Sequence, residues 1–209
     1  MREIEDPFEE LKHYAGKARA EKAISQLNEA IEAYENSRER DALRIIKPLY
    51  EKYPQALGLL ELYGMCLYAN SKYKQALQVL TEFTEKTSSY DQYPLLMDIY
   101  RYEKNYEKVN SLWDELGAVS PSGEVVAEGR IVHSQSLAEQ GKISEALKHL
   151  RKKVKPLSRP KPYHLRLWYC LADLEERAGN IIEARNWFNK ISKFDKNFAD
   201  VNYRINQLS

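Results

Sequence analysis

The side chains that could do chemistry are scattered along this sequence. The four histidines are His13, His133, His149 and His164, and none has a second histidine, a cysteine or a carboxylate at clear metal-ligand spacing. The sequence contains no glycine-rich phosphate loop and no GxSxG turn. Carboxylates are numerous, but no pair stands out for acid/base work. We therefore predict no catalytic residues, no metal and no cofactor, and interpret His133 as a hydrogen-bonded core histidine.

The two cysteines, Cys66 and Cys170, lie 104 residues apart, and both fall within apolar helical patterns. This favours buried small residues in a reducing cytoplasm over a disulfide or a reactive thiol. The first ten residues, MREIEDPFEE, are acidic and lack the apolar core of a secretory signal. The main apolar stretch, residues 56–69, is too short to span a bilayer of roughly 30 Å. We expect a cytoplasmic protein without a membrane partner.

The most unusual local feature is a basic segment, residues 151–161. Its six positive side chains are Arg151, Lys152, Lys153, Lys155, Arg159 and Lys161. We interpret it as the solvated C-terminal end of a helix that runs into a proline-rich loop, because cations complement the helix dipole there. The alternative is a site for the phosphates of a nucleic acid or for another polyanion, with Tyr163 and Trp168 stacking on bases.

Charge is unevenly spread along the chain, although the net charge is only +1. Residues 1–120 carry 16 basic and 21 acidic side chains, a net charge of −5, whereas residues 121–209 carry 16 and 10, a net charge of +6. Such a chain could bind partners of opposite sign at its two ends. It could equally stack head to tail or form a homo-oligomer.

The elements that would position these residues are clearest in residues 168–195. Trp168, Leu171 and Leu174 recur at helical spacing, and a second apolar series occupies residues 181–191. Gly179 and Asn180 interrupt the pattern between the two series. The segment is predicted to be an antiparallel hairpin of two helices.

A small or apolar residue recurs at the equivalent place of five such segments. The positions are Ala42, Ala76, Val109, Ala146 and Ala184, at separations of 34, 33, 37 and 38 residues. A register that holds over five segments predicts a repeat protein. Each hairpin alone cannot bury its apolar face, so the hairpins must stack.

The pattern Trp168-x-x-Leu171-Ala172, followed by Ala184-x-x-x-Phe188, resembles the tetratricopeptide (TPR) signature. Three positions depart from it: Ala172 replaces the usual Gly, Glu175 the usual Tyr, and Lys196 the closing Pro. The resemblance covers about residues 23–198. The chain also resembles the small stand-alone TPR proteins of bacteria. The resemblance implies an all-α fold, a right-handed solenoid of about five hairpins with an extra helix at each end.

We predict a single domain, residues 1–209, with the repeats bounded as follows. An N-terminal helix occupies residues 1–22, the repeats are 23–56, 57–89, 90–126, 127–164 and 165–198, and a capping helix occupies residues 199–209.

The resemblance also implies a concave groove that is lined by the first helix of each repeat. By register with the family its residues are Glu61, Met65, Tyr68, Asp98, Arg101, Ile131, Gln135, Tyr169, Asp173 and Glu176. Chaperone-binding members hold a C-terminal carboxylate with a Lys/Asn/Arg clamp, but the clamp's Asn places here hold Ile31, Met65, Asp98, Gln135 and Asp173. We therefore expect a non-enzymatic adaptor for a protein or peptide segment with apolar anchors. Nucleic-acid binding and self-assembly remain the alternatives.

Overall fold

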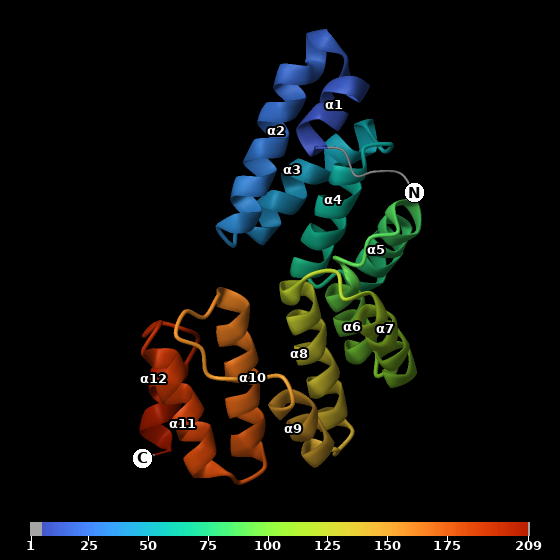
Figure 1. Ribbon diagram of the computed structural model, residues 1–209. Helices are drawn as coiled ribbons and strands as arrows, with labels where there is room; N and C mark the ends of the chain where they lie inside the picture. The colour runs from blue at the N-terminus through green and yellow to red at the C-terminus, as the bar shows by residue number, and fades with distance from the viewer. Residues whose placement is uncertain (1–5, 209) are drawn as a thin grey trace. The chain divides into compact units, whose positions relative to one another are not determined.

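The structure is a computed structural model that describes residues 6–208, and these residues form α-helices without β-strands (Figure 1). The prediction of an all-α fold is confirmed. The helices are α1 (Pro7–Ala15), α2 (Lys17–Glu35), α3 (Glu39–Lys52), α4 (Leu57–Ala69), α5 (Tyr73–Thr87), α6 (Tyr93–Tyr102), α7 (Tyr106–Val119), α8 (Gly123–Glu139), α9 (Ile143–Arg151), α10 (Pro162–Arg177), α11 (Ile181–Ser192) and α12 (Val201–Gln207). Among these helices, none is long and apolar enough to cross a lipid bilayer.

The turns inside the predicted hairpins share one backbone geometry. Each contains a residue in the left-handed region, with φ between 53° and 82°: Ser37, Ser71, Lys104, Gly141 and Gly179. The following N–H donates to the carbonyl five residues earlier, as from Asn180 to Glu175 at 2.8 Å. This bond defines the Schellman motif that ends a helix. The Gly-Asn turn predicted at Gly179 is therefore confirmed, and the same turn occurs even where glycine is absent.

The predicted register of small residues is also confirmed. Ala42, Ala76, Val109, Ala146 and Ala184 are each the fourth residue of α3, α5, α7, α9 and α11, and each is fully buried. A small side chain at this point allows the second helix of a hairpin to cross its neighbours closely. Gly64 serves the same purpose on α4, since a Cβ there would lie 2.5 Å from Leu80 Cδ2.

The chain divides into two compact units, residues 1–99 and 100–209. In the first unit, successive helices from α1 to α5 pack on one another, and α1 also lies against α4. Glu10 of α1 is buried and accepts a hydrogen bond of 3.1 Å from the N–H of Gly58, at the start of α4. Because the helix N-terminus leaves such donors unsatisfied, Glu10 stabilises the end of α4 as well as attaching α1.

In the second unit, α8 and α10 lie side by side, with α9 packed against both (Figure 1). The hairpin of α10 and α11 is centred on Trp168 and Phe188, which are fully buried. Helix α12 packs on α11 and buries Val201. The unit thus ends in a short helix that covers the last hairpin.

The helix bounds refine the predicted segments. The segment 1–22 contains α1 and the first six residues of α2, because α1 ends at Ala15 and Gly16, with φ of 69°, separates it from α2. The segment 199–209 contains α12. Residues 1–5 of the first segment and residue 209 of the second lie outside the described residues. The domain division itself stays a prediction.

Candidate functional site

A hollow of about 220 Å³ lies between α8 and α10 in the second unit, and we call it the α8–α10 pocket. Helix α8 contributes Glu128, Ile131 and Gln135, helix α10 contributes Arg166, Tyr169, Cys170 and Asp173, and the segment after α11 contributes Phe198. Residues three or four apart share one face of a helix, so each helix presents one row of side chains to the pocket. Four residues of the predicted groove, Ile131, Gln135, Tyr169 and Asp173, line this pocket together.

The inner wall of the pocket is largely apolar. The Tyr169 ring lies 5.9 Å from the Phe198 ring, and Ile131 and Cys170 lie beside them. Gln135 is half-buried, and its amide has no hydrogen-bond partner within residues 6–208. An amide offers both a donor and an acceptor, as a peptide backbone does. The wall therefore suits an apolar side chain, with a backbone running past Gln135.

The rim of the pocket carries charges that are already paired. Arg166 donates to Glu128 at 2.5 Å and to Glu124 at 3.0 Å. Asp173 accepts from Arg204 of α12 at 2.9 Å. Because Arg166 is shared by two carboxylates and Arg204 by Asp173 and Glu176, the rim keeps a net negative charge, which disfavours an anionic ligand.

Helix α12 and the residue before it engage three residues of the predicted groove. Arg204 donates to Asp173 and, at 2.8 Å, to Glu176, and the Tyr169 hydroxyl donates to Asp200 at 2.6 Å. Along the sequence, the Asp173–Arg204 and Tyr169–Asp200 partners are each 31 residues apart, close to one repeat. Helix α12 therefore occupies the place that the first helix of a further hairpin would take.

The reactive groups in the α8–α10 pocket are held in their neutral forms. Burial raises the pKa of the Cys170 thiol to about 12. Burial and the hydrogen bond to Asp200 raise the pKa of Tyr169 to about 12. A thiol or a phenol with such a pKa is a poor nucleophile at neutral pH.

The predicted groove residues of the first unit are bonded to nearby polar groups. The Gln92 amide donates to Glu61 Oε1 at 2.8 Å and lies 3.8 Å from the sulfur of Met65. Burial raises the pKa of Glu61, and the bond from Gln92 partly offsets that effect. The Tyr68 hydroxyl donates to Asp98 at 2.6 Å.

The predicted groove residue Arg101 belongs to the second unit. It forms an ion pair with Glu139, at the C-terminal end of α8. It does not line the α8–α10 pocket.

The basic segment lies almost wholly in a loop, since α9 ends at Arg151 and α10 begins at Pro162. Arg151 donates two hydrogen bonds to Glu175, at 2.7 and 2.6 Å, and Glu175 is buried. This residue therefore serves the fold. Lys153 lines a second hollow, beside Arg130. Like Lys153, the remaining members are exposed: Lys152, Lys155, Arg159 and Lys161.

The histidines are not all scattered in space, which sequence spacing alone missed. His133 Nδ1 lies 3.4 Å from His149 Nε2, and the His133 ring stacks on Trp113 at 5.4 Å. His133 is hydrogen-bonded as predicted, since Asn110 Oδ1 lies 3.1 Å from its Nε2, but it is half-buried and not part of the core. Residues 133 and 149 are equidistant from Gly141 in the turn, and that symmetry predicts their contact in an antiparallel hairpin.

The histidine pair does not form a metal centre with its neighbours. Within the described part of the chain, no group of three or more His, Cys, Asp or Glu side chains is placed to hold a metal ion. The cation Arg130 lies 3.4 Å from His149 Nε2 and would repel a second cation. Burial, followed by the charges of Arg130, His133 and Lys152, lowers the pKa of His149 to about 3.

Comparisons with known proteins rest on structure rather than on sequence. No protein-family model matches the sequence, and no curated protein matches it either. A thermophilic TPR protein of Thermus thermophilus has a similar structure, with a TM-score of 0.73 and 16% sequence identity over 89% of this chain and 98% of that one.

Two further solved structures are similar at the same low identity. A chain of the APC/C hetero-tetramer Cut9–Hcn1 has a TM-score of 0.69 and 16% identity. The match covers 89% of this chain and 36% of the APC/C chain. The MamA protein has a TM-score of 0.55 and 16% identity over 85% of this chain and 94% of that one. The register, the repeated turns and these similarities together identify the fold of this chain as the tetratricopeptide-repeat solenoid.

Proposed function

We propose that this protein is a non-enzymatic scaffold that binds a segment of a partner protein, with an apolar side chain of that segment in the α8–α10 pocket. One observation carries the proposal. The pocket combines an apolar wall with the unpaired amide of Gln135, while the charges on its rim are paired within the chain. Such a site favours an apolar anchor and a peptide backbone over an anionic ligand.

The similar structures support a scaffold in general terms. The APC/C structure contains a hetero-tetramer of Cut9 and Hcn1, so a chain with a related fold assembles with another protein there. The neutral thiol of Cys170 and the neutral phenol of Tyr169 support binding rather than catalysis at the pocket. The cytoplasmic location stays a prediction.

A test of the pocket must leave α12 in place. Substitution of Asp173 or Tyr169 would also remove the bonds to Arg204 and Asp200, so lost binding would not identify the pocket. Gln135→Trp fills the pocket without removing a hydrogen bond between described residues. Gln78→Trp, at an exposed position of α5, is the matched control.

We would use the wild-type protein and both variants as baits in native extract and quantify the captured polypeptides by mass spectrometry. The proposal expects at least one polypeptide that Gln135→Trp loses and Gln78→Trp retains, with equal helicity in all three baits. Extract treated with nuclease and washed at high salt tests the polyanion alternative in parallel, since phosphate contacts weaken steeply with salt. If Gln135→Trp captures the same set as wild type, the pocket is not the binding site.

A further inference from the structure

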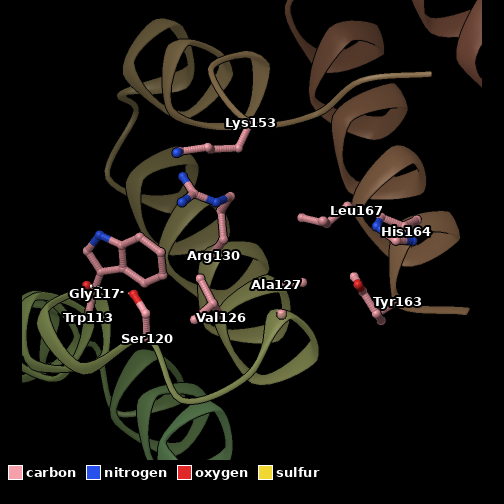
Figure 2. A pocket seen from close by; sticks show the side chains of 11 residues that line it. Trp113, Gly117, Ser120, Val126, Ala127, Arg130, Lys153, Tyr163, His164 and Leu167 are labelled. Carbon is pink, nitrogen blue, oxygen red and sulfur yellow. Dashed lines mark hydrogen bonds between the residues drawn. The ribbon is translucent and has the colours of Figure 1, made fainter. Parts of the chain in front are cut away.

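A second hollow in the same unit, of about 400 Å³, is separate from the α8–α10 pocket. We call it the Arg130 pocket. It lies between the C-terminal part of α7, the first two turns of α8, the loop after α9 and the first turns of α10 (Figure 2). The two pockets share no lining residue, so each can be tested without the other.

The Arg130 pocket contains two cations and no acidic lining residue. The ends of the Arg130 and Lys153 side chains point toward one another (Figure 2). Neither pairs with a carboxylate among residues 6–208. Like charges that face each other in a partly enclosed site repel, and an anion between them would turn that repulsion into attraction.

Arg130 is held firmly in this position. Its guanidinium carbon lies 4.9 Å from the centre of the Trp113 ring, and NH1 donates to the carbonyl of His149 at 3.3 Å. Burial lowers the pKa of Arg130, but a guanidinium keeps its charge in proteins. The stacking and the backbone bond leave the other guanidinium N–H groups available, in an orientation fixed before any ligand arrives.

Two further donors lie on α10, on the other side of the pocket from Arg130 and Lys153 (Figure 2). His164 Nδ1 accepts a hydrogen bond of 2.9 Å from the Lys161 backbone N–H, so its single proton is on Nε2 and can be donated. Gly123 leaves space beside the Tyr163 hydroxyl, because a Cβ at position 123 would lie only 3.2 Å from that oxygen. Both residues line the pocket.

The remaining walls are apolar and aromatic. Trp113 and Tyr163 supply ring surfaces, and Val126, Ala127 and Leu167 supply aliphatic ones. A bare inorganic anion would leave these walls in contact with water. The walls therefore favour an anion that is attached to an organic group of about ring size.

We infer that the Arg130 pocket binds a phosphate monoester whose ester group is a ring. Two cations match the double charge that such a phosphate approaches at neutral pH. The guanidinium of Arg130 can bind two phosphate oxygens at once, while Lys153 acts as a point charge. The shared chemistry fits both a free small molecule and a phosphorylated side chain of a partner protein.

The first experiment measures binding of phenyl phosphate to the full chain by calorimetry at low salt. We expect saturable binding that is tighter than that of inorganic phosphate, and no binding of uncharged benzyl alcohol. Lys153→Gln should weaken the affinity about tenfold or more, since a charged hydrogen bond contributes roughly 1.5–3 kcal/mol. Lys155→Gln, in the same basic segment but outside the pocket lining, should leave the affinity unchanged.

Arg130→Gln should weaken phenyl phosphate binding at least as much as Lys153→Gln. Arg130 also supports Trp113, so its variant needs a helicity check; Lys153 makes no bond that folding requires and keeps the test valid if that check fails. No saturable binding, equal binding of benzyl alcohol, or an affinity insensitive to Lys153→Gln would overturn the inference.

Two further ligands separate the possible sources of the phosphate. Adenosine monophosphate represents a free small molecule, and a phosphotyrosine peptide with its unphosphorylated form represents a modified partner. Tighter binding of the nucleotide than of phenyl phosphate would assign a small-molecule ligand. Tighter binding of the phosphopeptide, lost in the unphosphorylated form, would assign a phosphorylated partner.

Discussion

The ion pair between Arg151 and Glu175 provides the sharpest test of how this repeat is built. Glu175 stands where the TPR signature has Tyr, and Arg151 belongs to the basic segment that could have bound a polyanion. The Glu175 side chain is only 2% exposed, and it accepts two bonds from Arg151 and one of 2.8 Å from Asn180. We predict that Arg151→Ala destabilises the second unit strongly.

The magnitude follows from what the substitution leaves behind. Breaking a buried pair by removing one partner costs about 3–5 kcal/mol, because the other charge stays buried. Arg151 is itself 53% exposed, so water can reach part of the carboxylate after truncation, and we reduce the figure to about 2–3 kcal/mol. For a domain of this size the melting temperature should fall by about 5–10 °C.

Tryptophan fluorescence during urea unfolding is a suitable assay, because all three tryptophans, Trp113, Trp168 and Trp187, lie in the second unit. Lys155→Ala removes an equally basic but exposed side chain and should change stability by less than about 0.5 kcal/mol. The double variant Arg151→Met with Glu175→Tyr replaces the pair with apolar groups and should recover most of the loss. A loss no greater than that of Lys155→Ala would refute the reasoning, as would a double variant that merely adds the two single losses.

Three other predictions concern the turns and the histidine pair. Gly179→Ala should lower the free energy of unfolding by about 1 kcal/mol, because φ is +82° there, although an added Cβ would meet no atom within 4 Å. Lys104→Gly, at φ +58°, should raise the free energy of unfolding by about 0.5–1 kcal/mol. Urea unfolding measures both. The pKa of His149 lies near 3 in the folded chain and near 6.5 in the unfolded one, so the unfolded state binds more protons between these values. Stability should therefore be full above pH 6.5 and fall as the pH drops toward 3, and His149→Gln should reduce that fall in denaturation curves taken at several pH values. An unchanged pH dependence in the variant would show that other groups cause it.

The hairpins could be predicted because each rests on local chemistry. Small residues such as Ala42 and Ala184 must sit where helices cross, and they recur with the repeat. The turn at Gly179 was visible because glycine marks a left-handed residue, but Ser37 and Lys104 adopt the same conformation without that signal. In those turns the packing of the two helices outweighs the backbone preference.

The candidate sites were less accessible to sequence reasoning. Register with the repeat places Ile131 and Tyr169 on facing helices, which suffices to predict that they share a surface. It does not predict that Arg151 would form an ion pair with Glu175, because that contact joins the end of one hairpin to the interior of the next. The Arg130 pocket depends on loop residues such as Lys153, whose positions no periodic pattern fixes.

The bonds of α12 explain why we propose the α8–α10 pocket, and not the equivalent surface of α10 that α12 covers, as the binding site. Arg204 fills the space beside Asp173 and Glu176, and its guanidinium carbon lies 5.0 Å from the centre of the Phe188 ring. A terminal hairpin without such a cover would expose its apolar face to water. Helix α12 thus covers the surface beside Asp173 and Glu176, and the binding site that we propose is the pocket between α8 and α10.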